Sequence, residues 1–366
     1  MEVNRVEFDV AVIGGGPAGT SAAITAARLG ARVIILEAGE FPRHKVCGEF
    51  VSAESLDVLR DLLRLTPGAE QQLRAAPAID QTRLFLAGRV IQAQVAPPAL
   101  SIPRYALDFL LWQSVQQAGV EARSSCEVGS VHGNRPFLLE TSRGEVCART
   151  VIVAAGRWSK FKSRSPIPDG PKWIGAKAHY REHQTARSTD LYFFEHGYCG
   201  VQPVADDVVN ACAMVRSDRA KSLDEVLALH PVLAERSRNW QLVMQPVTTA
   251  PLLHLAPQPV RDSMMFVGDA AAFIDPFVGD GISIALRSGR LAATVLRAFL
   301  DGRSSLDSAL AAYENGYAQQ FEPLIAAAAR IRGVLSWPAP ARMVAFELLR
   351  LPGLMPYVIR RTRHAA

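Results

Sequence analysis

The glycine-rich loop GGGPAG, residues 14–19, constrains the fold of this chain more than any other feature of its sequence. An apolar run over 8–13 precedes the loop and predicts a strand, and the Ala-rich stretch 18–29 predicts a helix. Gly30 ends this helix, and the apolar residues 32–36 predict a second strand. Both strands are apolar nearly throughout, which is typical of a parallel sheet covered on both faces. The N-terminus is therefore predicted to form a βαβ unit.

The loop has the G-x-G-x-x-G spacing of a dinucleotide site. Gly14 allows the tight turn, Gly16 lets the backbone approach a pyrophosphate, and Gly19 lets helix and strand pack closely. The helix that begins around Pro17 and Ala18 presents free N–H groups to the anion. We therefore predict a bound dinucleotide; a glycine turn without a ligand is the alternative.

An acidic residue ends the second strand. Glu37 stands 18 residues after Gly19, where a carboxylate can accept hydrogen bonds from an adenosine ribose. Ala38 follows it, whereas an arginine there would indicate a 2'-phosphate. These features predict a dinucleotide without deciding between FAD and NAD.

The length and the patterning predict an α/β chain with two domains. A chain of 366 residues is too long for one ordinary core. Helices are predicted over 54–65, 106–118 and 282–300, and strands over 82–95 around Gly88, 120–128, 151–155 and 263–267. We predict a Rossmann-like cofactor domain from 1–75, 100–165 and 260–330, with an inserted, mostly β substrate domain from 76–99 and 166–259. Residues 331–366 are predicted to form a helical tail.

Composition narrows the class of protein. The net charge of +5 is scattered, which argues against a nucleic-acid partner. The five cysteines show no CxxC spacing, so no metal site is predicted and a reducing cytoplasm fits best. The best membrane-span candidate, 282–300, is interrupted by arginines. We expect a cytoplasmic globular protein without a membrane span.

A second signature lies far downstream, in VGDAAAFIDPFVGDGISIAL, residues 267–286. Gly268 and Asp269 follow an apolar strand, and Pro276, Gly279 and Gly281 precede a helix. The aspartate can bind ribityl hydroxyls, and the helix N-terminus directs its positive dipole end at a bound ring, favouring negative charge on a reduced flavin. This second signature favours FAD, although an ordinary strand, loop and helix is the alternative.

Four segments together resemble the FAD-dependent group with the p-hydroxybenzoate hydroxylase fold: the first loop, VAAG ending at Gly156, IPRYALD at 102–108, and the second signature. FPRHKVCGE at 41–49 and DPFVGDGISIALRSG at 275–289 are most similar to the geranylgeranyl reductase-like family. The resemblance implies that Arg43 and Lys45 lie near the cofactor edge. It also implies that Arg104 contacts the FAD diphosphate or ribityl side and that Val128 flanks the adenine.

The complete predicted cofactor-binding set combines both signatures with the resemblance. Its members are Gly14, Gly16, Pro17, Ala18, Gly19, Glu37, Ala38, Arg43, Lys45, Cys47, Gly48, Arg104, Val128, Ala155, Gly156, Gly268, Asp269, Pro276, Gly279, Gly281 and Ile282.

Cys47 is the candidate catalytic residue, because it lies in a basic turn next to glycine that could lower a thiol pKa. A small packing residue beside the ring is the alternative.

Further along, GYCG at 197–200 falls where reductases of this family show Gly-Tyr-x-Trp, and Gly200 replaces the Trp. This departure puts an isoprenoid substrate in question. We interpret His179 and His183 as solvated or core residues, because no HExxH motif or carboxylate cluster accompanies them.

Three functions remain open. The first is an FAD enzyme that reduces, or in reverse oxidises, a carbon–carbon bond of a hydrophobic small molecule through hydride at flavin N5. The second is a flavin monooxygenase acting on an aromatic or polyketide substrate. The third is a non-catalytic electron-relay protein.

The halogenase branch of the same fold requires a Trp-x-Trp-x-Ile-Pro motif that this sequence lacks. Without a second nucleotide loop, NAD(P)H would bind transiently as electron donor, or another reductase would supply electrons.

The tail over 337–363 mixes large apolar residues with arginines, namely Arg342, Arg350, Arg360, Arg361 and Arg363. Such a segment can lie on anionic lipid as a peripheral membrane contact. Packing against the substrate domain is the alternative that we favour from sequence.

Overall fold

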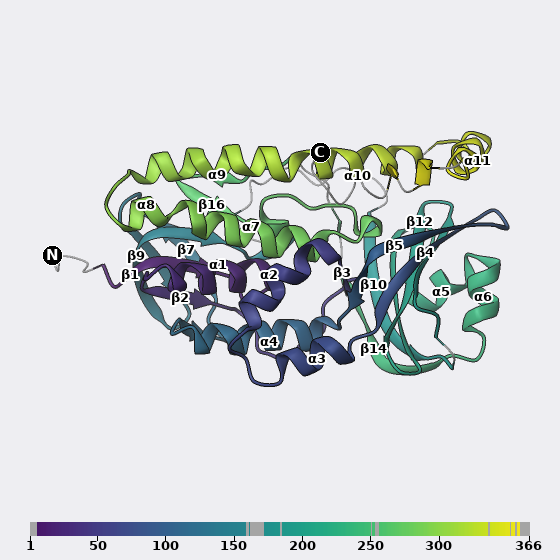
Figure 1. Ribbon diagram of the computed structural model, residues 1–366, viewed down its shortest axis with the longest axis horizontal. Helices are drawn as coiled ribbons and strands as arrows, with labels where there is room; N and C mark the ends of the chain where they lie inside the picture. Colours follow the sequence, from purple (N-terminus) through teal and green to yellow (C-terminus); the bar gives the residue numbers. More distant parts are fainter. Residues whose placement is uncertain are drawn as a thin grey trace.

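The structure is a computed structural model, and it describes residues 6–158, 161, 172–183, 185–249, 251–252, 256–335, 337–351, 353–355 and 357–358. These residues form two sheets that lie side by side, with helices packed on their faces. Helices α9 (Leu306–Gln320) and α10 (Glu322–Leu335) run along one side of both sheets, and α11 (Ala339–Leu348) follows them (Figure 1). The architecture is the predicted α/β class.

The first sheet carries the predicted βαβ unit and has the order β15-β16-β9-β1-β2-β6. The strands in this order are β1 (Phe8–Ile13), β2 (Val33–Leu36), β6 (Glu121–Arg123), β9 (Gly144–Val153), β15 (Val260–Arg261) and β16 (Met264–Phe266). Two further strands, β7 (Val128–His132) and β8 (Phe137–Thr141), join the sheet through β9. β1 is parallel to both neighbours, so that Val12 lies opposite Ile35 and Ile152. β16 joins beside β9 although it lies more than a hundred residues later in the chain. The sheet is thus assembled from distant segments.

Small residues let the helices of this sheet approach closely. α1 (Pro17–Arg28) packs along α7 (Gly281–Val295), and the Ser21 hydroxyl donates to the Leu286 carbonyl at 2.6 Å. A Cβ at Gly289 would lie 2.1 Å from the Ala18 carbonyl oxygen. Any larger residue at Gly289 would push the two helices apart, and both begin at the site described below. α2 (Ala53–Leu63), α3 (Ala69–Ala75) and α4 (Arg104–Gln117) complete this part.

The second sheet has the order β14-β10-β13-β12-β11-β4-β5-β3 and is antiparallel except between β11 and β4. Its strands are β3 (Phe50–Val51), β4 (Ala78–Leu86), β5 (Arg89–Ser101), β10 (Trp173–Arg181), β11 (Ser188–Phe194), β12 (Gly197–Ala205), β13 (Val208–Arg216) and β14 (Gln241–Thr249). The short helices α5 (Leu223–Ala228) and α6 (Pro231–Ser237) pack on one face. The predicted turn at Gly88 joins β4 to β5.

Two predicted elements differ from those observed. The strand expected over 120–128 ends at Arg123, because Ser125 adopts a positive φ of 50° and its N–H donates to the Gly39 carbonyl. The chain then forms the hairpin of β7 (Val128–His132) and β8 (Phe137–Thr141). The helix expected over 282–300 divides into α7 and the short α8 (Arg297–Leu300).

Within the described residues, no helix combines the length and the apolar composition that a bilayer crossing requires. Arg360, Arg361 and Arg363 of the predicted basic tail lie outside the described residues.

Candidate functional site

A cavity of about 810 Å³ is lined by residues of both sheets. Most of the predicted cofactor-binding residues face it: Gly14, Gly16, Pro17, Ala18, Glu37, Ala38, Lys45, Cys47, Gly48, Arg104, Val128, Ala155, Gly156, Asp269, Pro276, Gly279, Gly281 and Ile282. Its volume is in the range of ordinary cofactor and ligand sites. The fold therefore brings the two distant glycine signatures to one cavity.

The first wall is the phosphate loop. Gly14 has a φ of 105°, and a Cβ there would lie 2.5 Å from the Ala154 carbonyl oxygen. Gly16 precedes α1 in an extended conformation, and no side chain caps the helix. The first N–H groups of α1 are therefore left for a ligand, and the helix dipole places partial positive charge beside them.

Glu37 secures this loop and faces the cavity. Its Oε2 accepts from the Gly15 N–H at 2.7 Å, and its Oε1 accepts from the Gly39 N–H at 2.8 Å. Burial acts to raise the pKa of Glu37, but Arg43, with its guanidinium 2.8 Å away, and these N–H donors hold it below its usual value. Because a carboxylate oxygen can accept two hydrogen bonds, Oε2 of Glu37 can still accept one from a ribose hydroxyl of FAD.

Arg104 supplies a fixed positive charge opposite the loop. Its guanidinium Nη2 lies 3.9 Å from where a Cβ of Gly16 would stand. Asp108, one helical turn along α4 and fully buried, holds Arg104 through two hydrogen bonds of 2.7 Å. Burial acts to lower the pKa of Arg104, but Asp108 outweighs it and holds the pKa above its usual value. The arginine therefore stays charged where the resemblance expects the FAD diphosphate.

A second helix terminus faces the cavity from the other side. α7 begins at Gly281, and the side chain of Asp280 at its N-cap makes no capping bond. Gly279 has a φ of 81°, and a Cβ there would approach the Phe50 ring to 3.0 Å. Two uncapped helix N-termini thus converge on one cavity. This pairing suits FAD, whose diphosphate and reduced ring both carry negative charge.

Asp269 and its neighbours line the same side. The Asp269 carboxylate lies 3.7 Å from the Arg157 guanidinium, which in turn stacks over the Phe273 ring at 4.4 Å. Arg157 also lines the cavity and was not predicted from sequence. A signal existed, because Arg157 directly follows the VAAG segment that ends at Gly156.

Three predicted cofactor-binding residues do not line the cavity. Arg43 is turned toward Glu37 and lies over the Phe41 ring, so it supports the acid that faces the ligand. Gly19 packs against the loop, since a Cβ there would lie 1.9 Å from the Gly14 carbonyl oxygen. Gly268 has a φ of 58° and packs on Ala18, since a Cβ at Gly268 would lie 3.0 Å from the Ala18 Cβ.

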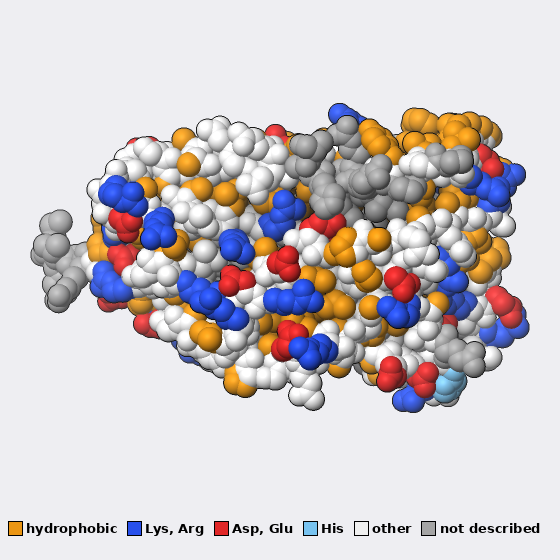
Figure 2. Space-filling view, viewed as in Figure 1, with side chains coloured by type: hydrophobic (Ala, Val, Ile, Leu, Met, Phe, Trp, Pro, Cys, Tyr) orange, Lys and Arg blue, Asp and Glu red, His pale blue; other side chains and the backbone are white. Residues whose placement is uncertain are grey.

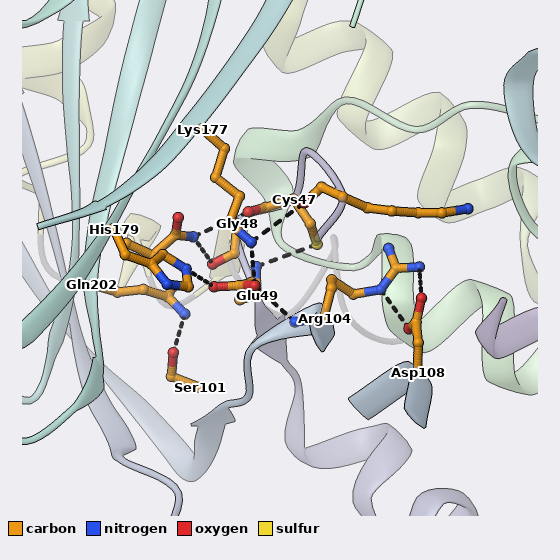
Figure 3. Close-up of polar contacts among 11 residues, drawn as sticks. Cys47, Gly48, Glu49, Ser101, Arg104, Asp108, Lys177, His179 and Gln202 are labelled. Atoms are coloured by element: carbon orange, nitrogen blue, oxygen red, sulfur yellow. Dashed lines mark hydrogen bonds and ion pairs between the residues drawn. The ribbon is translucent and has the colours of Figure 1, made fainter. Parts of the chain in front are cut away.

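A buried ionic cluster, Glu49 with Lys177 and His179, lies where the two sheets meet (Figure 3). Glu49 Oε1 binds the Lys177 ammonium and accepts from the Arg104 N–H at 2.7 Å. Glu49 Oε2 lies 2.8 Å from His179 Nε2. The side chains of Glu49 and Lys177 are fully buried, and that of His179 is 8% exposed. These three residues, which we call the junction cluster, connect the 41–49 loop to β10.

Electrostatics keeps the Glu49 carboxylate of the junction cluster charged. Burial acts to raise the pKa of Glu49, but the hydrogen bond to His179 and the charge of Lys177 hold it below its usual value. Glu49 also has a positive φ of 63°, an uncommon conformation for a residue with a side chain. A left-handed residue holding a buried charge is typical of functional sites, where the surroundings enforce the conformation.

The junction cluster and Asn210 secure the turn that carries Cys47. The Asn210 side-chain amide donates to the carbonyls of Cys47 and Gly48, each at 3.0 Å, and Lys177 donates to the Lys45 carbonyl at 3.3 Å. The Cys47 thiol accepts from the Glu49 N–H at 3.3 Å. Residues of the second sheet thus fix the backbone of this turn against the cofactor end of the cavity.

Sequence reasoning missed the junction cluster. Glu49 was recognised only as the last residue of a family segment, Lys177 was not considered, and His179 was interpreted as solvated or core. His179 is buried, as in the second of these interpretations, but it is bound to a carboxylate that lines the cavity. The alternating spacing of Lys177 and His179 on one strand was the available signal, because it puts both on the same sheet face.

The other end of the cavity is apolar. It is lined from the second sheet and the 273–277 loop by Leu84, Leu191, Phe193, Tyr198, Met214, Leu252, Phe273 and Phe277. Gly200 also lines it, and a Cβ there would lie 3.3 Å from the Leu191 side chain. Any side chain larger than glycine at this position would therefore require Leu191 to shift.

Comparison with known proteins agrees with this geometry. The family model described as FAD binding domain matches residues 7–326. A menaquinone reductase of Mycobacterium tuberculosis (strain H37Rv) is 29% identical over 325 residues, covering 79% of this chain and 76% of the relative. Digeranylgeranylglycerophospholipid reductase 2 of Methanopyrus kandleri is 27% identical over 346 residues, covering 86% and 83%.

Among solved structures, the flavin-dependent brominase Bmp2 superposes with a TM-score of 0.78 at 22% identity, covering 97% of this chain and 93% of the brominase. At that identity the likeness concerns the fold. It supports the predicted p-hydroxybenzoate hydroxylase-like architecture.

Proposed function

From the premise that this chain belongs to the FAD-binding domain family and is an FAD-dependent oxidoreductase, we propose that it reduces a carbon–carbon double bond of a lipid's isoprenoid chain. The observation that carries the proposal is one cavity that has helix N-termini and Arg104 at one end and is lined largely by apolar side chains at the other. Similarity to reductases named for a menaquinone and for a digeranylgeranyl lipid supports a substrate of this class.

Reduced FAD, when bound, would supply the hydride for one carbon of the double bond, and the other carbon would gain a proton that originates from bulk solvent. The chain's own residues bind and orient both molecules. The N-termini of α1 and α7, with Arg104, neutralise the negative charge of the cofactor. The apolar end excludes water and holds the hydrocarbon chain beside the flavin end.

Residues of the junction cluster hold the geometry between these ends. Lys177 and Asn210 belong to the sheet that lines the apolar end, and they bind carbonyls of the turn at the cofactor end. Glu49, anchored by the Arg104 N–H, connects this turn to α4. The distance between bound lipid and bound FAD therefore depends on these contacts.

Electrons must come from outside the chain. NAD(P)H as a transient donor, or a separate reductase, completes the proposed cycle. Because lipids of this class reside in membranes, peripheral membrane association is part of the same proposal.

Anaerobic turnover tests the proposal. The holo-protein, reduced with dithionite under nitrogen, is incubated with detergent-dispersed menaquinone or a geranylgeranyl-chain glycerolipid, and products are analysed by mass spectrometry. We expect a gain of two hydrogens per reduced bond without oxygen, located in the isoprenoid-chain fragments, because reduction of a quinone ring by dithionite adds its two hydrogens to the ring fragment. A flavin monooxygenase is the second candidate, favoured by the enclosed apolar end of the cavity. If product forms only with oxygen, and in proportion to the oxygen consumed, the protein is a monooxygenase and the proposed reductase activity is wrong.

A further inference from the structure

The C-terminal segment that follows α10 covers the apolar end of the cavity. We call residues 337–351, 353–355 and 357–358 the C-terminal roof. On its inner side, Phe346 and Met355 are buried in a cluster with Leu84 and Leu191 of the second sheet. Leu349, Met355 and Val358 line the cavity itself. One side of the roof therefore forms a wall of the proposed lipid site.

The outer side of the roof is also apolar. Its exposed large side chains are Trp337 (49% exposed), Met343 (38%), Val344 (61%), Leu348 (49%), Leu351 (54%) and Tyr357 (47%). Val344 and Leu348, four residues apart on α11, have the spacing that puts residues on one helix face, and Leu351 follows the end of this helix. Figure 2 shows hydrophobic side chains gathered over α11, at the upper right of that view. An exposed apolar patch of this kind marks an interaction surface.

Positive charge flanks this patch. Arg342 and Arg350 lie on the roof, and Arg89, at the tip of the adjoining β4–β5 hairpin, is 45% exposed beside the 43% exposed Val90. Glu347 is the acid among the described roof residues, and it is bound by both Arg89 and Arg350. Three arginines against one glutamate leave excess positive charge next to the apolar side chains.

We propose that the outer face of the C-terminal roof docks on an anionic bilayer surface. Apolar side chains rimmed by arginines match the two layers of such a surface, acyl chains below charged headgroups. The opposite face of the same segment lines the apolar end of the cavity, so docking brings a membrane lipid's chain next to its site. The lipid's role as substrate rests on the proposed function, whereas docking needs no turnover.

Vesicle cosedimentation of the FAD-loaded full chain tests the docking. Vesicles contain phosphatidylcholine alone or an equal mixture with phosphatidylglycerol. We expect binding to the mixed vesicles that weakens as salt is raised, because headgroup attraction is screened. In the double variant Val344→Glu/Leu348→Glu, the partition coefficient should fall at least about tenfold, since two apolar side chains no longer enter the bilayer.

A matched control uses two apolar residues exposed elsewhere. Leu242 (45% exposed) and Val243 (50%) lie on β14, so Leu242→Glu/Val243→Glu makes the same chemical change away from the roof. This control should bind vesicles like the unmodified protein. Both double variants should keep their FAD absorbance and melting temperature, because each of the four side chains is at least 45% exposed.

The outcomes separate the alternatives. Absence of binding to phosphatidylglycerol vesicles, or equal binding by the Val344→Glu/Leu348→Glu variant, overturns the proposal. So does a concentration-dependent dimer that this variant dissociates, with no vesicle binding, since the face would then join two copies of the chain. If vesicle binding behaves as expected but menaquinone and geranylgeranyl lipids are not reduced, the proposed function fails while the docking stands.

Discussion

The phosphate loop and the junction cluster both help to form the wall of the cavity, but they do so by different physical means. The loop acts through backbone N–H groups and through glycines that admit no Cβ, all within 14–19. The junction cluster acts through buried side chains, Glu49 from the 41–49 loop with Lys177 and His179 from β10. The first is local in sequence and the second joins positions 128 and 130 residues apart. The phosphate loop should therefore be disrupted by substitutions that add side-chain atoms. The junction cluster should be disrupted by substitutions that remove one of its charged partners.

Gly19→Val should have the largest effect. A Cβ at Gly19 would lie 1.9 Å from the Gly14 carbonyl oxygen, and neither backbone segment can move without displacing the loop. We expect FAD content after purification to fall at least about tenfold, together with soluble yield. Gly333→Ala is the control, because nothing lies within 4 Å of a Cβ there. A Gly19→Val protein that retains FAD would show that the close packing of the loop is not needed.

Lys177→Met should have the second-largest effect, and it tests the junction cluster. Removing Lys177 leaves the fully buried Glu49 carboxylate without its ammonium partner, which typically costs about 3–5 kcal/mol of unfolding free energy. Urea unfolding measures this loss. Adding Glu49→Gln should recover part of it, since the uncompensated charge is removed.

The matched control for Lys177→Met is Arg74→Met. Arg74 pairs with Glu70 on the surface, where the two side chains are 79% and 58% exposed, and such pairs contribute about 1 kcal/mol or less. Equal losses in the two variants would contradict the view that burial makes the junction cluster important.

This difference also explains how much could be predicted from sequence. The loop, Glu37 and the residues around Gly281 were identified because each feature is complete within a short segment. The strand after 120 ended early because of a contact between Ser125 and Gly39, which no local pattern encodes. Arg43 was expected near the cofactor edge, but its ion pair with Glu37 was not foreseen, because a cation's partner depends on which nearby acid the fold presents. Lys177 remained unnoticed because its partner Glu49 lies 128 residues earlier in the chain, in the 41–49 loop.

The pH dependence of the free energy of unfolding should show a smaller effect of the junction cluster. The pKa of folded Glu49 lies below its usual value near 4.5. Its carboxylate therefore contributes stability above that value, and the contribution is lost as pH falls through the folded pKa. In Glu49→Gln the urea midpoint should be lower at neutral pH but should decline less on acidification. The exposed Glu70→Gln serves as control and should keep the slope of the unmodified protein. An unchanged slope in Glu49→Gln would mean that other carboxylates govern acid unfolding.

Cys47→Ala should have the smallest effect, and it decides whether the turn held by the junction cluster contributes chemistry or only shape. The thiol accepts a long hydrogen bond from the Glu49 N–H at 3.3 Å and lies beside the Arg104 guanidinium, while Asn210 holds the carbonyls of the turn independently. Losing the thiol should therefore change the unfolding free energy by less than about 1 kcal/mol and leave FAD bound. Anaerobic turnover then distinguishes the two roles. Turnover within a few-fold of the unmodified protein, with FAD retained, assigns Cys47 to packing, whereas turnover that disappears while FAD and stability are unchanged assigns its sulfur to the reaction. Cys147→Ala, at a buried thiol outside the cavity, controls for loss of a cysteine as such.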